Sequence, residues 1–110
     1  MIRIDTVWLA GEPLDMRAGI NTALSRVVQV FGAAHPHHAY VFTNRRCSRL
    51  KVFVHDGLGM WLASRQLNRG TFVWNHAASP SHSISIEQLS ILVMGLPWNN
   101  IGQAGVIRII

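Results

Sequence analysis

The chain has 110 residues and a formal net charge of +5, with 49% hydrophobic and only 14% charged residues. This length predicts one domain, residues 1–110, with enough apolar residues to bury a core and fold alone. The low charged fraction leaves apolar surface for a partner protein or a homo-oligomer. The single cysteine, Cys47, excludes an internal disulfide framework. With neither a secretory leader nor an apolar run of about 18 residues, we expect a cytoplasmic protein without a membrane segment.

The first third of the chain predicts one strand followed by one helix. Residues 2–10 mix β-branched and aromatic residues and stop at a Gly-Glu-Pro turn, which is typical of a strand. A helix is predicted over residues 15–31, because apolar residues recur there at helical spacing. Asp15 is suited to cap the start of this helix, and Gly32 is suited to end it.

Residues 39–74 predict an antiparallel β-meander. Strands are expected at 39–43 and 50–55, joined as a hairpin by the loop 44–49, with a third strand at 60–64. Side-chain alternation in the second strand places one set of apolar residues in the core, and places Lys51, Phe53 and His55 together on the opposite face. A turn at residues 68–70 precedes a candidate fourth strand, residues 71–74.

The last part of the chain predicts a loop, a helix and a tail. Residues 75–83 are small and polar and contain Pro80, which is typical of an exposed loop. Ser85 and Gln88 have the spacing of a capping box, which predicts a second helix over residues 86–94 that ends at Gly95. Residues 106–110 predict either an edge strand or an apolar handle for a partner. The expected fold class is α+β: a small single domain with an antiparallel β-meander and two main helices.

The positive charge is concentrated in residues 44–74, which hold six cations against the single acid Asp56 and so carry the whole net charge. A local cationic field favours a polyanion, most often nucleic acid, because Lys and Arg displace counterions from phosphates. A protein contact, or a solvated strand face whose cations discourage aggregation, are the alternatives. The candidate nucleic-acid-binding residues are Arg45, Arg46, Arg49, Lys51, Arg65 and Arg69.

Patterns for metal binding and catalysis are weak. Three histidines straddle Pro36 in a predicted loop, and neither a Cys-x-x-Cys nor a helical His-x-x-x-His fixes a zinc geometry. The five acids fit turn, cap and first-turn positions better than a Mg²⁺ cluster for nuclease chemistry. Cys47 lies among arginines, which favours a lowered thiol pKa, but it lacks a histidine beside it in sequence. We therefore expect no metal, no cofactor, no catalytic residue and no enzyme activity.

Several short blocks keep a fixed order and spacing over nearly the whole chain. The blocks are Val7-Trp8-Leu9-Ala10, Asp15-Met16-Arg17-x-Gly19, Phe42-x-Asn44-Arg45-Arg46-x-x-Arg49-Leu50-Lys51, Asp56-Gly57-x-Gly59 with Leu62, Arg65-x-Leu67-x-x-Gly70-x-Phe72-x-Trp74, and Gln88-Leu89 to Gly95-Leu96-Pro97-Trp98. Together they resemble the small accessory protein encoded by the second open reading frame of insertion sequence 66 type elements, called TnpB. The chain departs from that pattern at Asn75, where Pro is common, and at Cys47, where a small residue is usual.

The resemblance implies a protein of bacterial transposable elements that works alongside a separate transposase in transposition and DNA recombination. The arginine-rich loop adds a surface suited to DNA, such as element ends or a transposase complex. The alternative is an adaptor that binds the transposase without DNA, for which four tryptophans and arginine anchors would supply an interface. DNA versus RNA, sequence specificity and oligomeric state stay open.

Overall fold

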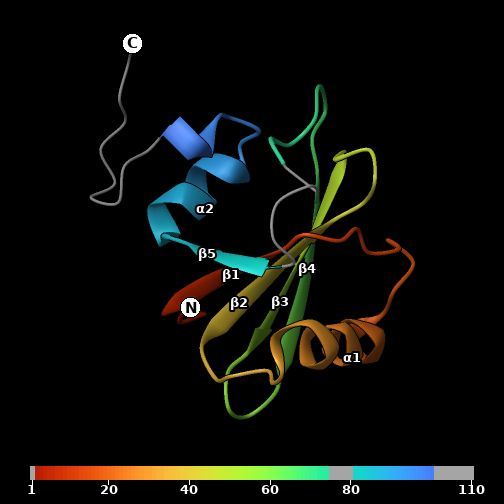
Figure 1. Ribbon diagram of the computed structural model, residues 1–110, viewed down its shortest axis with the longest axis vertical. Coiled ribbons are helices and arrows are strands. Elements are labelled where there is room, and N and C mark those ends of the chain that lie inside the picture. The colour runs from red at the N-terminus through yellow and green to blue at the C-terminus, as the bar shows by residue number, and fades with distance from the viewer. Residues whose placement is uncertain (1, 75–80, 101–110) are drawn as a thin grey trace.

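The computed structural model describes residues 2–74 and 81–100. Five strands form one mixed sheet in the order β4-β3-β2-β1-β5, with two helices packed on it (Figure 1). This confirms the predicted α+β class. The elements are β1 (Thr6–Ala10), α1 (Ile20–Phe31), β2 (His38–Thr43), β3 (Arg49–His55), β4 (Met60–Gln66), β5 (Ser81–Ile84), α2 (Ile86–Leu92) and the 3₁₀ helix η1 (Trp98–Asn100).

The antiparallel meander is confirmed for three strands, β2, β3 and β4. Val52 of β3 lies opposite Val41 of β2 on one side and opposite Ala63 of β4 on the other. The sequence did not predict the partners of β1, which pairs parallel with β2 and antiparallel with β5. Because parallel neighbours need a long crossover, the chain passes from β1 to β2 through α1.

Both faces of the sheet are buried. α2 covers the face that carries Val7, Val41 and Leu50, whereas α1 covers the face that carries Tyr40 and Phe53. Lys51 and Phe53 do share the face opposite the first apolar set, as predicted, but the expectation that only one face is core was wrong, since Phe53 is completely buried. Strands covered on both sides are nearly continuous apolar runs, so alternation alone does not reveal which face is exposed.

The start of α1 differs from the prediction. The helix begins at Ile20 with Gly19 in the cap position and without a side-chain cap. Asp15 lies earlier, where its backbone oxygen accepts from the N–H of Ala18 at 3.0 Å in a separate turn. Asp is favoured both at helix caps and at the first position of turns, so the sequence alone does not distinguish the two structures at Asp15. The end at Gly32 is confirmed, since this residue adopts a φ of 87°.

Residues 71–74 form no strand, which corrects the predicted fourth strand of the meander. Phe72 instead turns inward and is buried against the α2 side of the sheet. Part of the predicted loop 75–83 is also a strand, because residues 81–84 pair with β1 as β5. The rest of that loop, residues 75–80, and the tail 106–110 lie outside the described residues.

The capping box of α2 is confirmed in both directions. The Ser85 hydroxyl accepts from the Gln88 N–H at 3.0 Å, and the Gln88 side chain accepts from the Ser85 N–H at 2.8 Å. The helix is shorter than predicted and ends at Leu92. Gly95 follows with a φ of 76°, a conformation that favours glycine, and a Cβ there would also displace the end of the Leu67 side chain, which lies 2.7 Å away.

Tyr40 links the connector after α1 to the central strand, and this contact generates a stability prediction. Its buried hydroxyl donates to the Ala33 oxygen at 3.2 Å and accepts from the His35 N–H at 2.9 Å. Tyr40→Phe should lower the free energy of unfolding by about 1–3 kcal/mol, because two polar groups lose their partner inside the protein. Urea denaturation measures this change.

Ser90→Ala is the matched control, because the Ser90 hydroxyl bonds the Ile86 oxygen at an exposed position. Its effect should stay within about 0.5 kcal/mol. Equal effects of the two variants would contradict a structural role for the Tyr40 hydroxyl.

Candidate nucleic-acid interface

The loop between β2 and β3 is organised by Asn44. Its side-chain oxygen accepts from the Ser48 N–H at 2.9 Å, and its side-chain nitrogen donates to the Ser48 hydroxyl at 2.8 Å. The Asn44 backbone oxygen also accepts from the Cys47 N–H at 3.1 Å, which closes a β-turn. Arg45 and Arg46 occupy the two central positions of this turn, and both are exposed.

Two further backbone hydrogen bonds hold this loop in place. The Cys47 oxygen accepts from the Phe72 N–H at 2.7 Å, which ties the loop to the segment after β4. The Thr43 oxygen accepts from the Leu14 N–H at 2.8 Å, which brings the segment before α1 alongside the end of β2. The loop therefore contacts two segments that are distant in sequence.

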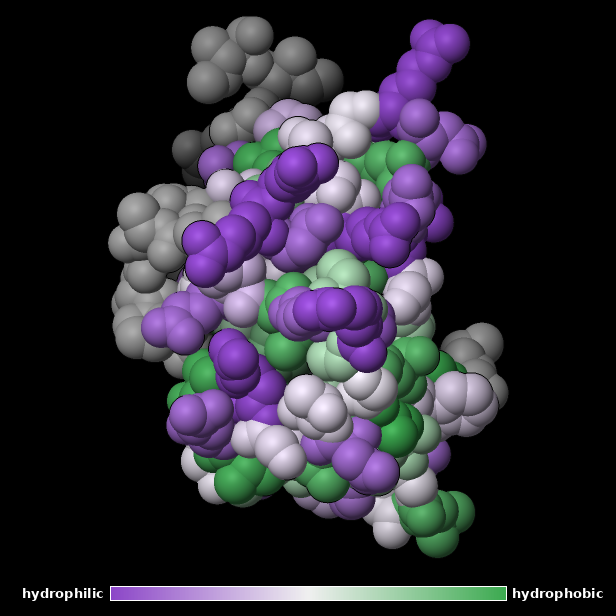
Figure 2. Space-filling view, turned by 90° about the vertical axis from the view of Figure 1, so that its right-hand side faces the viewer, coloured by the Kyte–Doolittle hydropathy of each residue, from purple (hydrophilic) through white to green (hydrophobic). Residues whose placement is uncertain are grey.

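These contacts shape a groove, here called the basic groove, on the side of the molecule that carries the β2–β3 loop. Two adjoining hollows form it, and they share Met16 and Arg49. Figure 2 views the molecule from that side and shows strongly hydrophilic residues across the upper part of this face. The lining residues are Pro13, Leu14, Asp15, Met16, Asn44, Arg45, Arg49, Leu50, Lys51, Ser64, Arg65 and Gln66.

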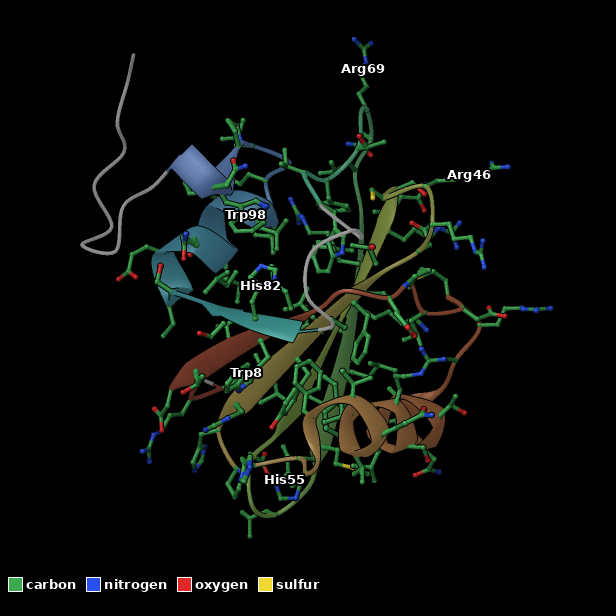
Figure 3. The ribbon with its side chains drawn as sticks, in the orientation of Figure 1. Trp8, Arg46, His55, Arg69, His82 and Trp98 are labelled. Carbon is green, nitrogen blue, oxygen red and sulfur yellow. The ribbon has the colours of Figure 1, made fainter. Side chains whose placement is uncertain are left out.

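Four of the six sequence-predicted cations line the basic groove, namely Arg45, Arg49, Lys51 and Arg65. The other two, Arg46 and Arg69, extend outward from the loops at the same end of the molecule (Figure 3). Arg49 and Lys51 lie on the face of the sheet that α1 covers, next to the turn that carries Arg45. Arg65 lies opposite Leu50, so its side chain is on the α2 face, where its Nε donates to the Val93 oxygen, and it borders the groove from the other face of the sheet.

Lys51 and Arg65 are anchored to backbone oxygens on opposite faces of the sheet. Lys51 Nζ donates to the Ala18 oxygen at 2.7 Å, and Arg65 Nε donates to the Val93 oxygen. Neither acceptor is charged, so neither cation is neutralised by these contacts. The anchors fix the direction of both side chains and connect β3 to the segment before α1 and β4 to the end of α2.

Asp15 is the single acid among the lining residues. Arg17 donates to both carboxylate oxygens, at 3.2 and 2.8 Å, and its backbone N–H donates at 2.9 Å. The Arg17 side-chain hydrogen bonds, and then its backbone N–H, hold the pKa of the Asp15 carboxyl at about 2. Asp15 is therefore ionised at neutral pH, and its charge is compensated by an exposed arginine at the rim.

Four histidines, His35, His37, His38 and His55, gather at the opposite end of the sheet, whereas His82 lies in β5 beside Trp98. The His37 N–H donates to the His55 oxygen at 2.6 Å, and Trp8 Nε1 donates to His38 Nδ1 at 3.1 Å. Burial, and then the neighbouring His35, lower the pKa of His38. Within residues 2–74 and 81–100, no three His, Cys, Asp or Glu side chains are grouped so that they would hold a metal ion. His76 lies outside the described residues.

Cys47 differs from the expectation that neighbouring arginines lower its pKa. Burial raises the pKa of the thiol, and a hydrogen bond with Thr43 lowers it by less. The residue also has a φ of 56°, so the turn uses a left-handed conformation there. Burial thus outweighs the Thr43 hydrogen bond, and the thiol is half-buried rather than presented to a substrate.

Sequence reasoning missed the residues that shape the groove. Met16 forms the junction of the two hollows, and Asn44 organises the turn that carries the arginines. Asn44 had a readable signal, because Asn is favoured at the first position of a β-turn. Met16 had none, since its position depends on the long-range bond between Leu14 and Thr43.

Comparisons with known proteins identify relatives over almost the whole chain. Residues 5–103 match the family model described as IS66 Orf2 like protein. The uncharacterized protein y4hO of Sinorhizobium fredii is 38% identical over 96 residues, which cover 86% of this chain and 83% of y4hO. The uncharacterized protein y4jC of the same organism is 32% identical over 104 residues, which cover 93% of this chain and 88% of y4jC. No solved structure matches the chain significantly.

None of the helices in the part of the chain that the structure describes is long and apolar enough to cross a membrane.

The environment of Cys47 predicts a slow thiol. Because its pKa is raised, less thiolate is present near pH 8 than in a free cysteine, so alkylation by iodoacetamide should be slower. In urea the alkylation rate should return to that of a free cysteine. In the folded protein the increase of the rate with pH should occur at a higher pH than for free cysteine. Cys47→Ser should leave folding and transposition intact; fast labelling of the folded protein would show that the thiol is activated.

Proposed function

The chain belongs to the IS66 Orf2-like family, and from this premise we propose that it is an accessory protein of insertion-sequence transposition that binds DNA and acts beside a separate transposase. Family membership supports the transposition role. The observation that carries the proposal of DNA contact is the basic groove, where Arg45, Arg49 and Lys51 line one concave surface and Arg65 borders it from the α2 face of the sheet.

The chemistry of the groove fits a phosphodiester backbone. Arginine presents a planar fork of donors that matches phosphate oxygens, and lysine adds a compact positive charge. Lys51 and Arg65 each use one N–H on a backbone oxygen, whereas an ammonium carries three donors and a guanidinium five. Their remaining donors are available to a ligand. Because the Lys51 side chain is already oriented by its bond to Ala18, its binding to phosphate would cost less side-chain entropy than that of a free lysine.

Arg46 and Arg69 extend this surface beyond the groove. Both project from loops at the same end of the molecule (Figure 3). A nucleic-acid backbone lying along the groove would pass within reach of these long side chains. In the proposed role three to five of the six cations contact phosphates, and sequence-independent contact dominates the affinity.

The proposed role includes no catalysis by this chain. Three of its acids form separate ion pairs, Asp5 with Arg3 at 2.9 Å, Asp15 with Arg17 at 2.8 Å and Glu12 with Arg26 at 3.9 Å. Nuclease chemistry requires carboxylates that converge on Mg²⁺. Cleavage of DNA by the purified protein that depends on a divalent metal would contradict this part of the proposal.

A titration tests the proposed function directly. The protein is titrated with element-end DNA and with scrambled DNA, each with and without the transposase. Binding to DNA alone supports the proposal, and a preference for element ends would add sequence specificity. If neither DNA binds while the transposase does, the protein is an adaptor rather than a DNA-binding protein.

The salt dependence of binding gives the sharpest prediction. If three to five cations contact phosphates, the slope of log affinity against log salt should be roughly −3 to −5, at about −0.9 per phosphate on duplex DNA. Replacing Arg45, Arg46 and Arg49 with alanine should flatten that slope by about 2 to 3 units. The melting temperature should stay nearly unchanged, because exposed charges contribute little to stability.

Arg3→Ala combined with Arg26→Ala is the control, because both cations lie outside the groove lining. This pair should change the slope by less than about one unit. An unchanged slope in the triple variant would move binding elsewhere, and a collapse of its melting temperature would mean that the loop arginines are structural.

Asp15 provides a test with the opposite sign. Asp15→Asn removes the negative charge from the groove lining and releases Arg17 from its ion pair, so affinity for DNA at low salt should rise severalfold. Asp5→Asn is the matched control, because it releases Arg3 in the same way at the far end of the sheet. Equal effects of the two variants would indicate a response to net charge rather than to the groove.

A further inference from the structure

β4 is an edge strand of the sheet and pairs through all seven of its residues with β3. Five of those seven residues are exposed, and Trp61 keeps 52% of its surface accessible. In the part of the chain that the structure describes, no backbone hydrogen bond reaches the outer side of β4. The strand therefore offers a row of backbone donors and acceptors to another chain.

The pairing of β4 with β3 fixes which groups point outward. The Asp56 N–H donates to the Gly59 oxygen at 3.1 Å, so this pair is hydrogen-bonded. Bonded and non-bonded pairs alternate along antiparallel strands, so the N–H and C=O groups of Trp61, Ala63 and Arg65 point toward β3. By the same alternation, those of every second residue point away from the sheet. The outward residues are Met60, Leu62, Ser64 and Gln66.

Within residues 2–74 and 81–100, this edge carries little of the usual protection against pairing. Native edge strands are commonly blocked by proline, by several lysines, by a bulge or by a covering segment. β4 contains no proline, pairs with β3 without a bulge, and carries one charge, Arg65, whose Nε is bonded to the Val93 oxygen. A seven-residue edge with one charge favours addition of a strand.

We propose that β4 pairs antiparallel with β4 of a second copy of this chain, around a two-fold axis at Ala63. In this register Met60 faces Gln66 of the second copy, and Leu62 faces its Ser64. All four outward residues of each strand then meet outward residues of the other. A shift by one residue would oppose outward groups to inward ones, and a shift by two would leave part of the edge unpaired.

The side chains of the strand also complement one another across this axis. Trp61 lies opposite Arg65 of the second copy in a non-bonded pair, where side chains approach closely and a guanidinium stacks on an indole. Trp61 Nε1 already donates to Asp56 at 3.0 Å, so the ring is held in place. Ala63, the smallest side chain of β4, lies on the axis itself. A two-fold contact requires a surface that complements itself. Because β4 has this property, we infer that it pairs with a second copy of this chain rather than with an unrelated strand.

Cross-linking tests the register, in the full-length protein with Cys47→Ser. Ala63→Cys should form an intermolecular disulfide on oxidation, because the two copies of residue 63 face each other at a Cα separation of about 4.5 Å in a non-bonded pair. Ser64→Cys is the control, since residue 64 faces residue 62 of the second copy and points to the opposite face of the sheet. It should cross-link poorly. Both positions are exposed, so neither change should disturb the core.

Light scattering without DNA tests the assembly independently. The chain should have twice its 12.3 kDa mass at high concentration. Trp61→Lys should weaken the dimer by at least about tenfold, because each of two symmetric pairs loses a cation–π contact and gains a like-charge repulsion. Leu58→Lys is the matched control, a fully exposed apolar residue on the neighbouring turn, and should leave the dimer unchanged.

A monomer at every concentration would overturn the proposal. So would equal cross-linking at positions 63 and 64, or a dimer that tolerates Trp61→Lys, because each of these results places the contact on another surface.

Discussion

Burial of both faces of the sheet is the constraint on which the rest of the structure depends. The central strand β2 is buried along almost its whole length, because α1 packs on one face and the α2 side of the chain packs on the other. An unpaired charge cannot be placed between these layers without a cost of several kcal/mol. The cations of residues 44–74 are therefore confined to loops, to the end of β3 and to the outer strand β4. Lys51 follows the same rule, since its aliphatic stem is half-buried and its ammonium reaches the Ala18 oxygen.

The basic groove results from long-range contacts more than from the arginines themselves. The bond from Leu14 to Thr43 and the bond from Lys51 to Ala18 both connect the segment before α1 with the basic hairpin. A third, from Phe72 to Cys47, connects the hairpin with the segment after β4. The same residues that complete the fold therefore determine where the positive charge lies. A surface held in this way retains its shape when a ligand leaves, unlike a loop that folds only on binding.

The sequence predicted the elements whose signals are local. The strands β2, β3 and β4, the capping box at Ser85 and the cluster of cations all depend on neighbouring residues, and the structure contains each of them. It could not predict what depends on distant contacts. Residues 81–83 read as part of a polar loop, yet together with the buried Ile84 they form a strand because β1 offers an edge. Residues 71–74 are β-prone and form no strand, and Phe72 packs in the core instead. The groove lay beyond reach for the same reason, since no local pattern brings Met16 beside Arg49.

The position of β1 has a consequence for the order in which the chain folds during synthesis. β1 is made first, yet it lies between β2 and β5, and β5 is the last strand of the described chain. Until residues 81–84 leave the ribosome, β1 has hydrogen-bond partners on one side only, along β2. The strand left with this open edge carries the apolar residues Val7 and Leu9. Proteins emerge from the N-terminus, and unpaired apolar edges of nascent chains associate with one another. A four-residue strand near the C-terminal end thus ends the period in which the nascent protein is vulnerable to aggregation through β1.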